Sequence, residues 1–360
     1  MLKSAILENE AAVAAGKPWL QTHAIADEAN VVSRDRLEAA LEKIRARVKD
    51  PSLGPFGPGS MLWRVYGQQT SGIAGGRALL LQTAHPFIAH AVQQKSAYRT
   101  DPQGRTERTF KAVLDWVYGD LDRAYGAART VFRIHTRVVG EIANRVGPYE
   151  QGDRYAANEQ RSQFWVHATG VDSALRMYEY IYGRLSREER ERYNEESKLF
   201  ALLFGIDEEL IPPTFGDFEE YMERMYESDV LTPDQASRDI AKYVLSAPNK
   251  QAAPAFAWLR LMTAGLLPER IRQGYHFPWG ALEQAAFDAS MVAIKRVTPR
   301  LPAPLRLSPY MRQAAHRAHQ TSPGLLERRL DETLERMAEA AAREPEAPRS
   351  VNQLGAAPAG

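Results

Sequence analysis

The sequence predicts an all-α fold made of a single multi-helix domain. Apolar residues recur every three or four positions through most of the chain, which is the period of amphipathic helices. Alternating apolar and polar runs of useful length, which would indicate strands, are absent. The chain has 360 residues, 44% of them hydrophobic and 25% charged, so it can form a core large enough to enclose a sizeable ligand.

Proline and glycine mark the boundaries of the predicted elements. A charged amphipathic pattern over 31–50 ends at Pro51 and the segment PSLGPFGPGS, so we expect residues 1–50 to be an N-terminal helical extension. The helical period then continues from about residue 76 to about residue 300, between loops expected at 99–106, 148–158, 212–216, 247–254 and 274–280. We therefore expect one domain over 51–305, a C-terminal helix over 306–335 and a disordered, Ala- and Pro-rich tail over 336–360.

The composition excludes several classes of function. The 46 Lys and Arg residues balance 45 Asp and Glu, so nothing indicates nucleic acid as a partner. No cysteine is present, which rules out disulfides, thiolate metal sites and covalently attached haem. Neither a long apolar run nor a convincing signal sequence is found, so we expect a cytoplasmic protein without a membrane span.

Common metal-binding and phosphate-binding spacings are also absent. The chain has no HExxH zinc helix, no Glu-x-x-His pair and no calcium-binding loop. The segment SGIAGGRALL lacks the lysine of a phosphate-binding loop and follows no predicted strand. Its glycines are therefore expected to serve close helix packing.

Three histidines stand where apolar residues are expected, each on the buried stripe of a predicted helix. His85 lies in a stripe from 78 to 92, His135 in one from 121 to 146, and His167 in one from 164 to 181. Burying an imidazole without partners for its polar atoms costs about 1–3 kcal/mol. Each ring is therefore expected to be hydrogen-bonded or to coordinate a ligand.

His167 has neighbours that leave room for a flat ligand. Ala168 and Gly170 are small, while Phe164 and Val171 share the face of the histidine. A macrocycle such as haem approaches a helix only where the side chains beside its axial ligand are short, so this stretch suits a haem site. The alternative is a core histidine hydrogen-bonded to a backbone carbonyl or to a group such as Asp172.

His135 is flanked by the basic side chains of Arg129, Arg133 and Arg137 and by Thr136. Cations keep a nearby imidazole neutral, and therefore able to ligate iron or to accept a hydrogen bond. Arginines also suit the propionates of a haem. The alternative is a solvated basic face with one inserted ring.

His85 precedes Pro86, which is expected to kink the helix because it has no N–H to donate. Such a kink would re-aim the imidazole, so a ligand or pocket role and a structural role both stay open. His90 lies on the opposite face and is expected to be an ordinary core residue.

Several motifs together resemble the DUF2236 family, which includes the bacterial rubber oxygenases, or latex clearing proteins, and the fungal MpaB oxygenase. Over about residues 50–300 they follow in the family's order and spacing: GGRALLLQTAHPFIAHAVQQKSAYRTDPQGRTERT, HTRVVG, FWVHATGVDS, LLFGIDEELIP and LLPERIRQGY. The resemblance implies a globin-like helical core around one haem b. It also implies that dioxygen is used to cleave carbon–carbon double bonds in isoprenoid-like or other unsaturated apolar molecules.

The resemblance also implies roles for individual residues. His167 corresponds to the family's axial iron ligand. Rubber oxygenases carry Arg-x-x-Lys-Thr on the distal helix; here Thr136 matches, His135 replaces the lysine, and the arginine is displaced to Arg133 or lost. In a gapless alignment His135 turns aside instead, and Arg133 and Thr136 occupy the oxygen side.

The candidate residues form three groups. The candidate catalytic residues are Arg133, His135 and Thr136; the candidate iron ligands are His167 and, as a second axial ligand, His135; the candidate cofactor-binding residues are His85, Arg129, Arg133, His135, Phe164, His167, Gly170 and Val171. Three functions stay open at this point. The first is a haem b oxygenase that takes dioxygen and an apolar small molecule, the second a non-catalytic bis-histidine haem protein for sensing, storage or electron transfer, and the third a helical protein with structural or metal-binding histidines and no haem.

Overall fold

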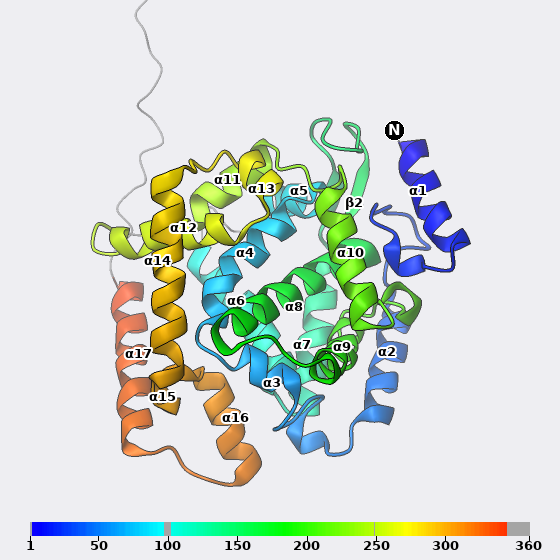
Figure 1. Cartoon of the computed structure of the whole chain (residues 1–360). Helices are drawn as coiled ribbons and strands as arrows, with labels where there is room; N and C mark the ends of the chain where they lie inside the picture. The colour runs from blue at the N-terminus through cyan, green and yellow to red at the C-terminus, as the bar shows by residue number, and fades with distance from the viewer. Residues whose placement is uncertain (1, 97–101, 248, 344–360) are drawn as a thin grey trace, which may run out of the picture.

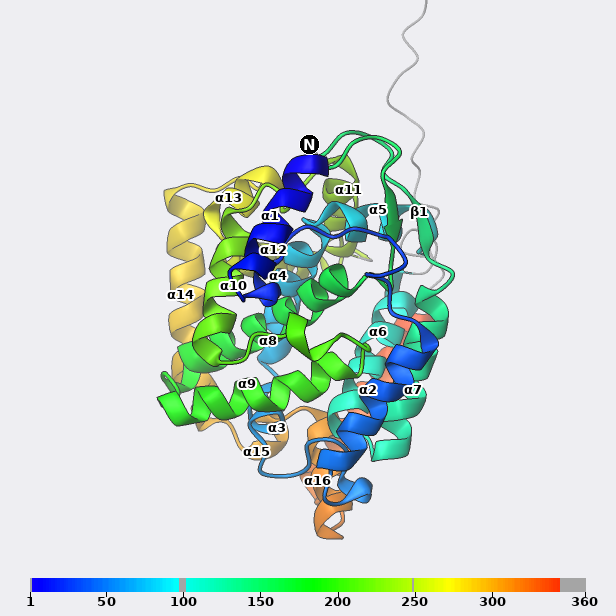
Figure 2. The ribbon, with the colours of Figure 1, turned by 90° about the vertical axis from the view of Figure 1, so that its right-hand side faces the viewer.

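A computed structural model, which describes residues 2–96, 102–247 and 249–343, confirms the all-α class. Seventeen α-helices and four short 3-10 helices make up most of these residues, and the one sheet among them has two strands of three residues each. Figures 1 and 2 show the helices arranged around a long central helix, α8 (Gln160–Tyr182). Within the described ranges, none of the helices has the length and hydropathy that a membrane crossing requires.

The N-terminal fifty residues hold two helices and one helical turn. These are α1 (Leu2–Ala14), η1 (Pro18–Leu20) and α2 (Arg34–Arg47). α2 lies within the helix expected over 31–50, and it begins where the Ser33 side chain accepts a hydrogen bond from the Arg36 N–H. Leu37, Leu41 and Ile44 repeat at helical spacing and are buried, so this face of α2 attaches the segment to the core.

The central helix α8 is buried on most of its circumference. Sixteen of its 23 residues are buried, as expected for a helix with apolar or small residues on nearly every face. It packs most extensively against α4 (Ser71–Thr83), where the indole Nε1 of Trp165 donates to the Leu81 carbonyl at 2.9 Å. A side chain at Gly76 would meet Thr263 Oγ1 of α12 (Ala253–Leu266) at 2.2 Å, so this glycine allows close helix packing.

The chain around His85 differs from the single kinked helix that we expected. α4 ends at Thr83, and a separate helix, α5 (Pro86–Lys95), begins at the proline. His85 has an extended backbone and caps α5, because its Nδ1 accepts a hydrogen bond from the Phe87 N–H at 3.2 Å. Pro86 therefore starts a helix, where its missing N–H costs nothing, and does not kink one.

The stripe expected over 121–146 is helical only in its first part, so the prediction of one continuous helix was wrong. α7 (Leu121–His135) follows α6 (Pro102–Tyr118) and ends at His135. The next residues include Val138, Val139 and Gly140, which are poor helix formers. β1 (Val139–Glu141) then pairs antiparallel with β2 (Arg154–Ala156), and this ribbon returns the chain to the start of α8.

The remaining elements surround the central helix. Before α4 lie η2 (Pro51–Leu53) and α3 (Met61–Tyr66), and after α8 come α9 (Arg187–Leu202), η3 (Glu208–Leu210), α10 (Phe215–Glu227), α11 (Gln235–Val244), α12, α13 (Glu269–Gly274), α14 (Ala281–Val297), η4 (Thr298–Arg300) and α15 (Ala303–Arg306). In Figure 1, α14 lies on the left side of the molecule, and α9 and α10 lie close to α8.

The C-terminal segment contains two helices where we expected one over 306–335. α16 (Pro309–His319) and α17 (Leu325–Arg343) are separated by a turn in which Pro323 and Gly324 interrupt the helical pattern. α17 also continues eight residues beyond the expected helix end. The rest of the tail expected over 336–360, residues 344–360, lies outside the described part of the chain.

Candidate functional site

The N-terminal half of α8 positions four of the predicted residues inside the protein. The helix begins at Glu159, whose buried carboxylate accepts a hydrogen bond from the Ser162 N–H at 2.7 Å. Phe164, His167 and Val171 then follow at spacings of three and four, and all three are buried. Gly170 lies on the same side of the helix.

His167 is a buried imidazole without a hydrogen-bond partner. Its side chain lies between the rings of Phe164 and Phe200, with centroid distances of 5.6 and 5.2 Å. Nδ1 is inaccessible and has no partner, and no hydrogen bond to either ring nitrogen is formed by the described residues. Burial lowers the pKa of His167 to about 3, so the ring is neutral at physiological pH.

Asp172, the alternative partner for His167, has a different role. Its carboxylate forms a buried ion pair with Arg77 of α4 at 2.7 Å, and it also accepts hydrogen bonds from Arg176 at 2.8 Å and from the Tyr226 hydroxyl at 2.8 Å. Burial alone would raise the pKa of Asp172, but Arg77 and Arg176 hold it below its usual value. Arg77 also donates to the Leu266 carbonyl, so this network fixes α8 against α4, α10 and α12.

The sequence analysis missed a group of aromatic residues next to His167. Phe200 of α9 contacts His167 and also Tyr66 of α3 at 6.2 Å and Trp116 of α6 at 5.5 Å between ring centroids. The Tyr66 hydroxyl and the Trp116 indole N–H are also inaccessible and without a partner. We refer to Tyr66, Trp116, His167 and Phe200 as the Phe200 cluster. No local spacing signals it, because its members come from four separate helices.

His135 reaches the same face of α8 through Gln163. The imidazole is half-buried at the end of α7, and its Nδ1 lies 3.4 Å from Gln163 Nε2. Gln163 precedes His167 by four residues, so the two side chains are neighbours on one helix face. Burial lowers the pKa of His135 to about 4, and Gln163 Oε1 is buried without a partner.

Three predicted residues on α7 point outward in this structure. Arg129 is exposed and forms a bidentate ion pair with Glu38 of α2 at 2.9 and 2.6 Å. Arg133 and Thr136 are also exposed, and the Thr136 hydroxyl donates to the Arg133 carbonyl at 2.8 Å. The structure therefore places His135, but not these three side chains, toward α8.

His85 has a separate environment. Its ring contacts Phe87 and Tyr149 at centroid distances of 5.7 and 6.0 Å, and its buried Nε2 has no partner. Burial lowers the pKa of His85 to about 3. By contrast, His90 is fully satisfied, since Nε2 lies 3.1 Å from Asp234 Oδ2 and Nδ1 accepts from the Ala143 N–H at 3.2 Å.

No group of three or more His, Cys, Asp or Glu side chains that could hold a metal is found in the part of the chain that the structure describes. The described residues thus do not form a three-histidine metal site. A single neutral imidazole among aromatic rings, as at His167, is the donor set expected where a bound macrocycle supplies the other metal ligands.

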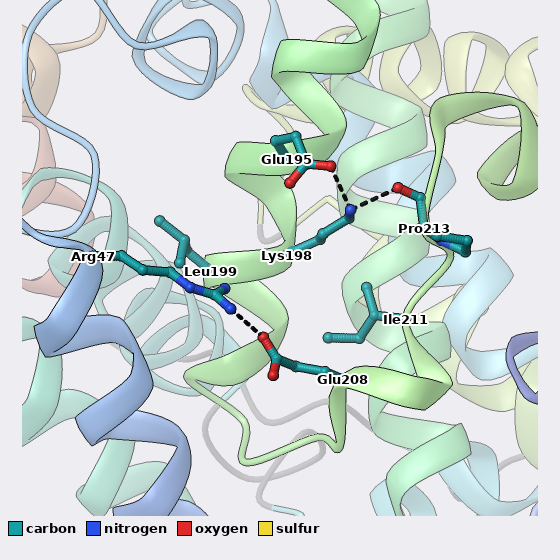
Figure 3. A pocket seen from close by; sticks show the side chains of 7 residues that line it. All are labelled: Arg47, Glu195, Lys198, Leu199, Glu208, Ile211 and Pro213. Atoms are coloured by element: carbon teal, nitrogen blue, oxygen red, sulfur yellow. Dashed lines mark hydrogen bonds and ion pairs between the residues drawn. The ribbon is translucent and has the colours of Figure 1, made fainter.

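A surface pocket of about 330 Å³ lies outside this region, between α2 and α9. Its lining residues are Arg47, Glu195, Lys198, Leu199, Glu208, Ile211 and Pro213. Figure 3 shows that the charged groups pair with one another: Arg47 contacts Glu208, and Lys198 contacts Glu195 and the Pro213 carbonyl. None of the predicted site residues lines this pocket.

Comparison with known proteins places the chain in one family. No curated protein and no solved structure shows significant similarity to it. The family described as "ER-bound oxygenase mpaB/B'/Rubber oxygenase, catalytic domain" matches residues 63–296, nearly two thirds of the chain. The match includes α4, α8 and α9, and with them His167, Phe200 and the Arg77–Asp172 pair. The chain therefore belongs to the MpaB and rubber oxygenase catalytic-domain family.

Proposed function

We propose that this protein is a haem b-dependent oxygenase that uses dioxygen on an apolar, unsaturated small molecule. Family membership supports oxygenase activity in general. The observation that carries the haem assignment is His167, a buried, neutral imidazole without a hydrogen-bond partner, set between two aromatic rings. Such a ring is costly unless it binds a ligand.

The described residues fit haem in two respects. His167 would hold a b-type haem by coordinating its iron, and the porphyrin would supply the other nitrogen ligands, which agrees with a lone histidine. Haem also needs apolar walls, and Phe164, Phe200 and Val171 are buried beside His167 or on its helix face. When bound, haem would supply a redox-active iron that activates dioxygen.

The residues of the chain would orient the ligand, exclude water from the His167 ring and hold protons at defined atoms. The low pKa of His167 keeps its lone pair free for a metal at every physiological pH. Phe164 and Phe200 keep water away from the ring. His135 and Gln163 place a neutral imidazole and an amide on the same face of α8, where they can hydrogen-bond a polar ligand atom.

The aromatic surroundings also support an apolar substrate. Trp116, Phe200 and Phe204 contact one another, with centroid distances between 4.7 and 6.2 Å, and extend the apolar wall from His167 toward α6. Aromatic rings of this kind bind the flat, polarizable double bonds of unsaturated chains. Cleavage of such a double bond is the reaction that we propose.

The proposal is tested by the visible spectrum of the purified protein. We expect a Soret band that His167→Ala abolishes. His90→Gln is the matched control, because His90 is equally buried but has partners of its own, and this variant should keep the band. Full haem retention by His167→Ala would overturn the assignment. Oxygen uptake with an added alkene, absent from the same variant, then tests turnover.

The bis-histidine haem protein is a second candidate, since His135 and His167 both lie at one face of α8 and both have low pKa values. It predicts a low-spin ferrous spectrum that carbon monoxide does not change, together with no oxygen uptake. A featureless visible spectrum would favour the third reading, in which the histidines are structural.

A further inference from the structure

The Phe200 cluster contains hydrogen-bond donors that the protein leaves unused. The Tyr66 hydroxyl and the Trp116 indole N–H have no partner, and both rings contact Phe200 at 6.2 and 5.5 Å. Trp116 is 2% exposed, so its N–H has no access to bulk solvent. The third member with an unpartnered polar atom, His167, contacts the same phenylalanine.

Several other buried groups of the same kind are hydrogen-bonded, whereas the Trp19 indole N–H and the Tyr118 hydroxyl also lack a partner. The Tyr193 hydroxyl donates to the Val171 carbonyl at 3.0 Å, and it lies close to the Tyr66 hydroxyl but outside hydrogen-bonding geometry. The indoles of Trp63 and Trp165 donate to backbone carbonyls at 2.7 and 2.9 Å. A buried donor without an acceptor destabilises a fold, and natural proteins retain few of them unless a ligand provides the acceptor.

The position of Tyr66 points its hydroxyl at the helix that carries His167. A side chain at Gly170 would lie 3.4 Å from the Tyr66 hydroxyl oxygen. Gly170 follows His167 by three residues, so the hydroxyl lies over the same face, less than one helical turn from the imidazole. A glycine at this position lets the phenol approach the helix closely.

The donor types limit the chemistry of the ligand. An indole N–H can only donate, and a phenol donates readily, so the complementary group is an acceptor oxygen. Neither donor carries a charge, which suits a carbonyl, a hydroxyl or a carboxylate.

We propose that Tyr66 and Trp116 form a binding site for an acceptor oxygen of a molecule held against α8 at Gly170. The proposal rests on the proposed function, which supplies two molecules that could carry this oxygen. One is haem b, through a propionate. The other is the organic substrate, which would then be an apolar chain with an oxygen-bearing end and not a pure hydrocarbon.

The first test measures the protein without any ligand. Tyr66→Phe removes an unused hydroxyl, so its thermal unfolding midpoint should equal or exceed that of the wild type. Tyr193→Phe is the matched control: it removes a buried hydroxyl that is hydrogen-bonded, and its midpoint should fall. A loss of stability in Tyr66→Phe as large as in Tyr193→Phe would overturn the proposal.

The second test compares two pairs of probes, each pair differing in its oxygen groups. Haem b is compared with iron etioporphyrin, which lacks propionates, and oleyl alcohol with cis-9-octadecene, which lacks the hydroxyl. Loss of one hydrogen bond in Tyr66→Phe should weaken the oxygen-bearing member of one pair about tenfold and leave its partner unchanged. Trp116→Phe should act in the same direction.

The pair that responds identifies the source of the oxygen. A selective loss for haem b assigns it to a propionate, and a selective loss for oleyl alcohol assigns it to the substrate. Unchanged binding of all four probes, or an equal loss within both pairs, would overturn the proposal. If the wild type does not bind haem, the proposed cofactor is wrong. The comparison of oleyl alcohol with cis-9-octadecene and the unfolding measurement would still test the proposed oxygen-binding site.

Discussion

Two buried polar residues in the middle of α8 are accommodated in opposite ways. Asp172 has an ion pair with Arg77 and hydrogen bonds from Arg176 and Tyr226, so its charge is fully compensated. His167, five residues earlier, has no partner for either ring nitrogen among the described residues. The first arrangement fixes the helix in place. The second leaves the ring nitrogens of His167 without a partner, as expected for a side chain that binds a ligand.

The largest effect is expected at Asp172, the residue whose charge is compensated. Asp172→Ala should lower the free energy of unfolding by about 3–5 kcal/mol, because it leaves Arg77 buried without its counter-charge. Chemical denaturation with urea measures this value. The double variant Arg77→Met/Asp172→Leu should lose less than Asp172→Ala alone, since no uncompensated charge is left inside. A double variant that is less stable than the single one would show that the network does more than balance charge.

A pH effect is expected at His167, the residue without a partner. The pKa of His167 falls from its ordinary 6.5 to about 3 on folding, so between these values the unfolded chain binds a proton that the folded protein does not. Stability should therefore decrease as the pH falls from 6.5 toward 3, by at most about 1.4 kcal/mol per pH unit for this group.

His167→Phe isolates this contribution in the protein without haem. Its stability should depend less steeply on pH between 6.5 and 4 than that of the wild type. A comparison at pH 8, where imidazoles are neutral in both states, gives the effect of packing alone. Equal slopes for the two proteins would contradict the burial of a neutral ring.

The smallest effect is expected on the outer side of α7. Arg133→Ala and Thr136→Val change exposed residues whose contacts are local, so each should alter the free energy of unfolding by no more than about 0.5 kcal/mol. The Soret band of the haem-loaded protein should stay where it is. A shifted Soret band would show that Arg133 or Thr136 contacts the cofactor, as the family resemblance implies.

The fold class and the central histidine follow from the sequence because both depend on local periodicity. Repeats of three and four locate α2, the first part of α7 and α8, and the same repeats identify His167 as a buried ring. Periodicity does not indicate where a helix ends. For this reason the sequence predicted one helix through Pro86 and one over 121–146, whereas a new helix begins at Pro86 and a strand begins at Val139.

The Phe200 cluster and the Arg77 pair could not be predicted from the sequence, since each depends on contacts between distant segments. Arg77 and Asp172 are 95 residues apart in the chain, and Tyr66 and Phe200 are farther apart still. Nothing in the vicinity of Tyr66 or Trp116 distinguishes an unused donor from a satisfied one. Only the packing of α3, α6, α8 and α9 makes that distinction.

The short β-ribbon between α7 and α8 brings together two side chains that are far apart in the sequence. His135 and Gln163 lie 28 residues apart in sequence, yet β1 and β2 bring their side chains to 3.4 Å. The turn at Gln151 and Gly152 is exposed, and a side chain at Gly152 would meet nothing within 4 Å. A fluorescent label at Gln151 is therefore expected to leave His135 and Gln163 in place, which makes this position suitable for following ligand binding from outside the protein. Gly152 is kept, because its φ of 90° favours glycine.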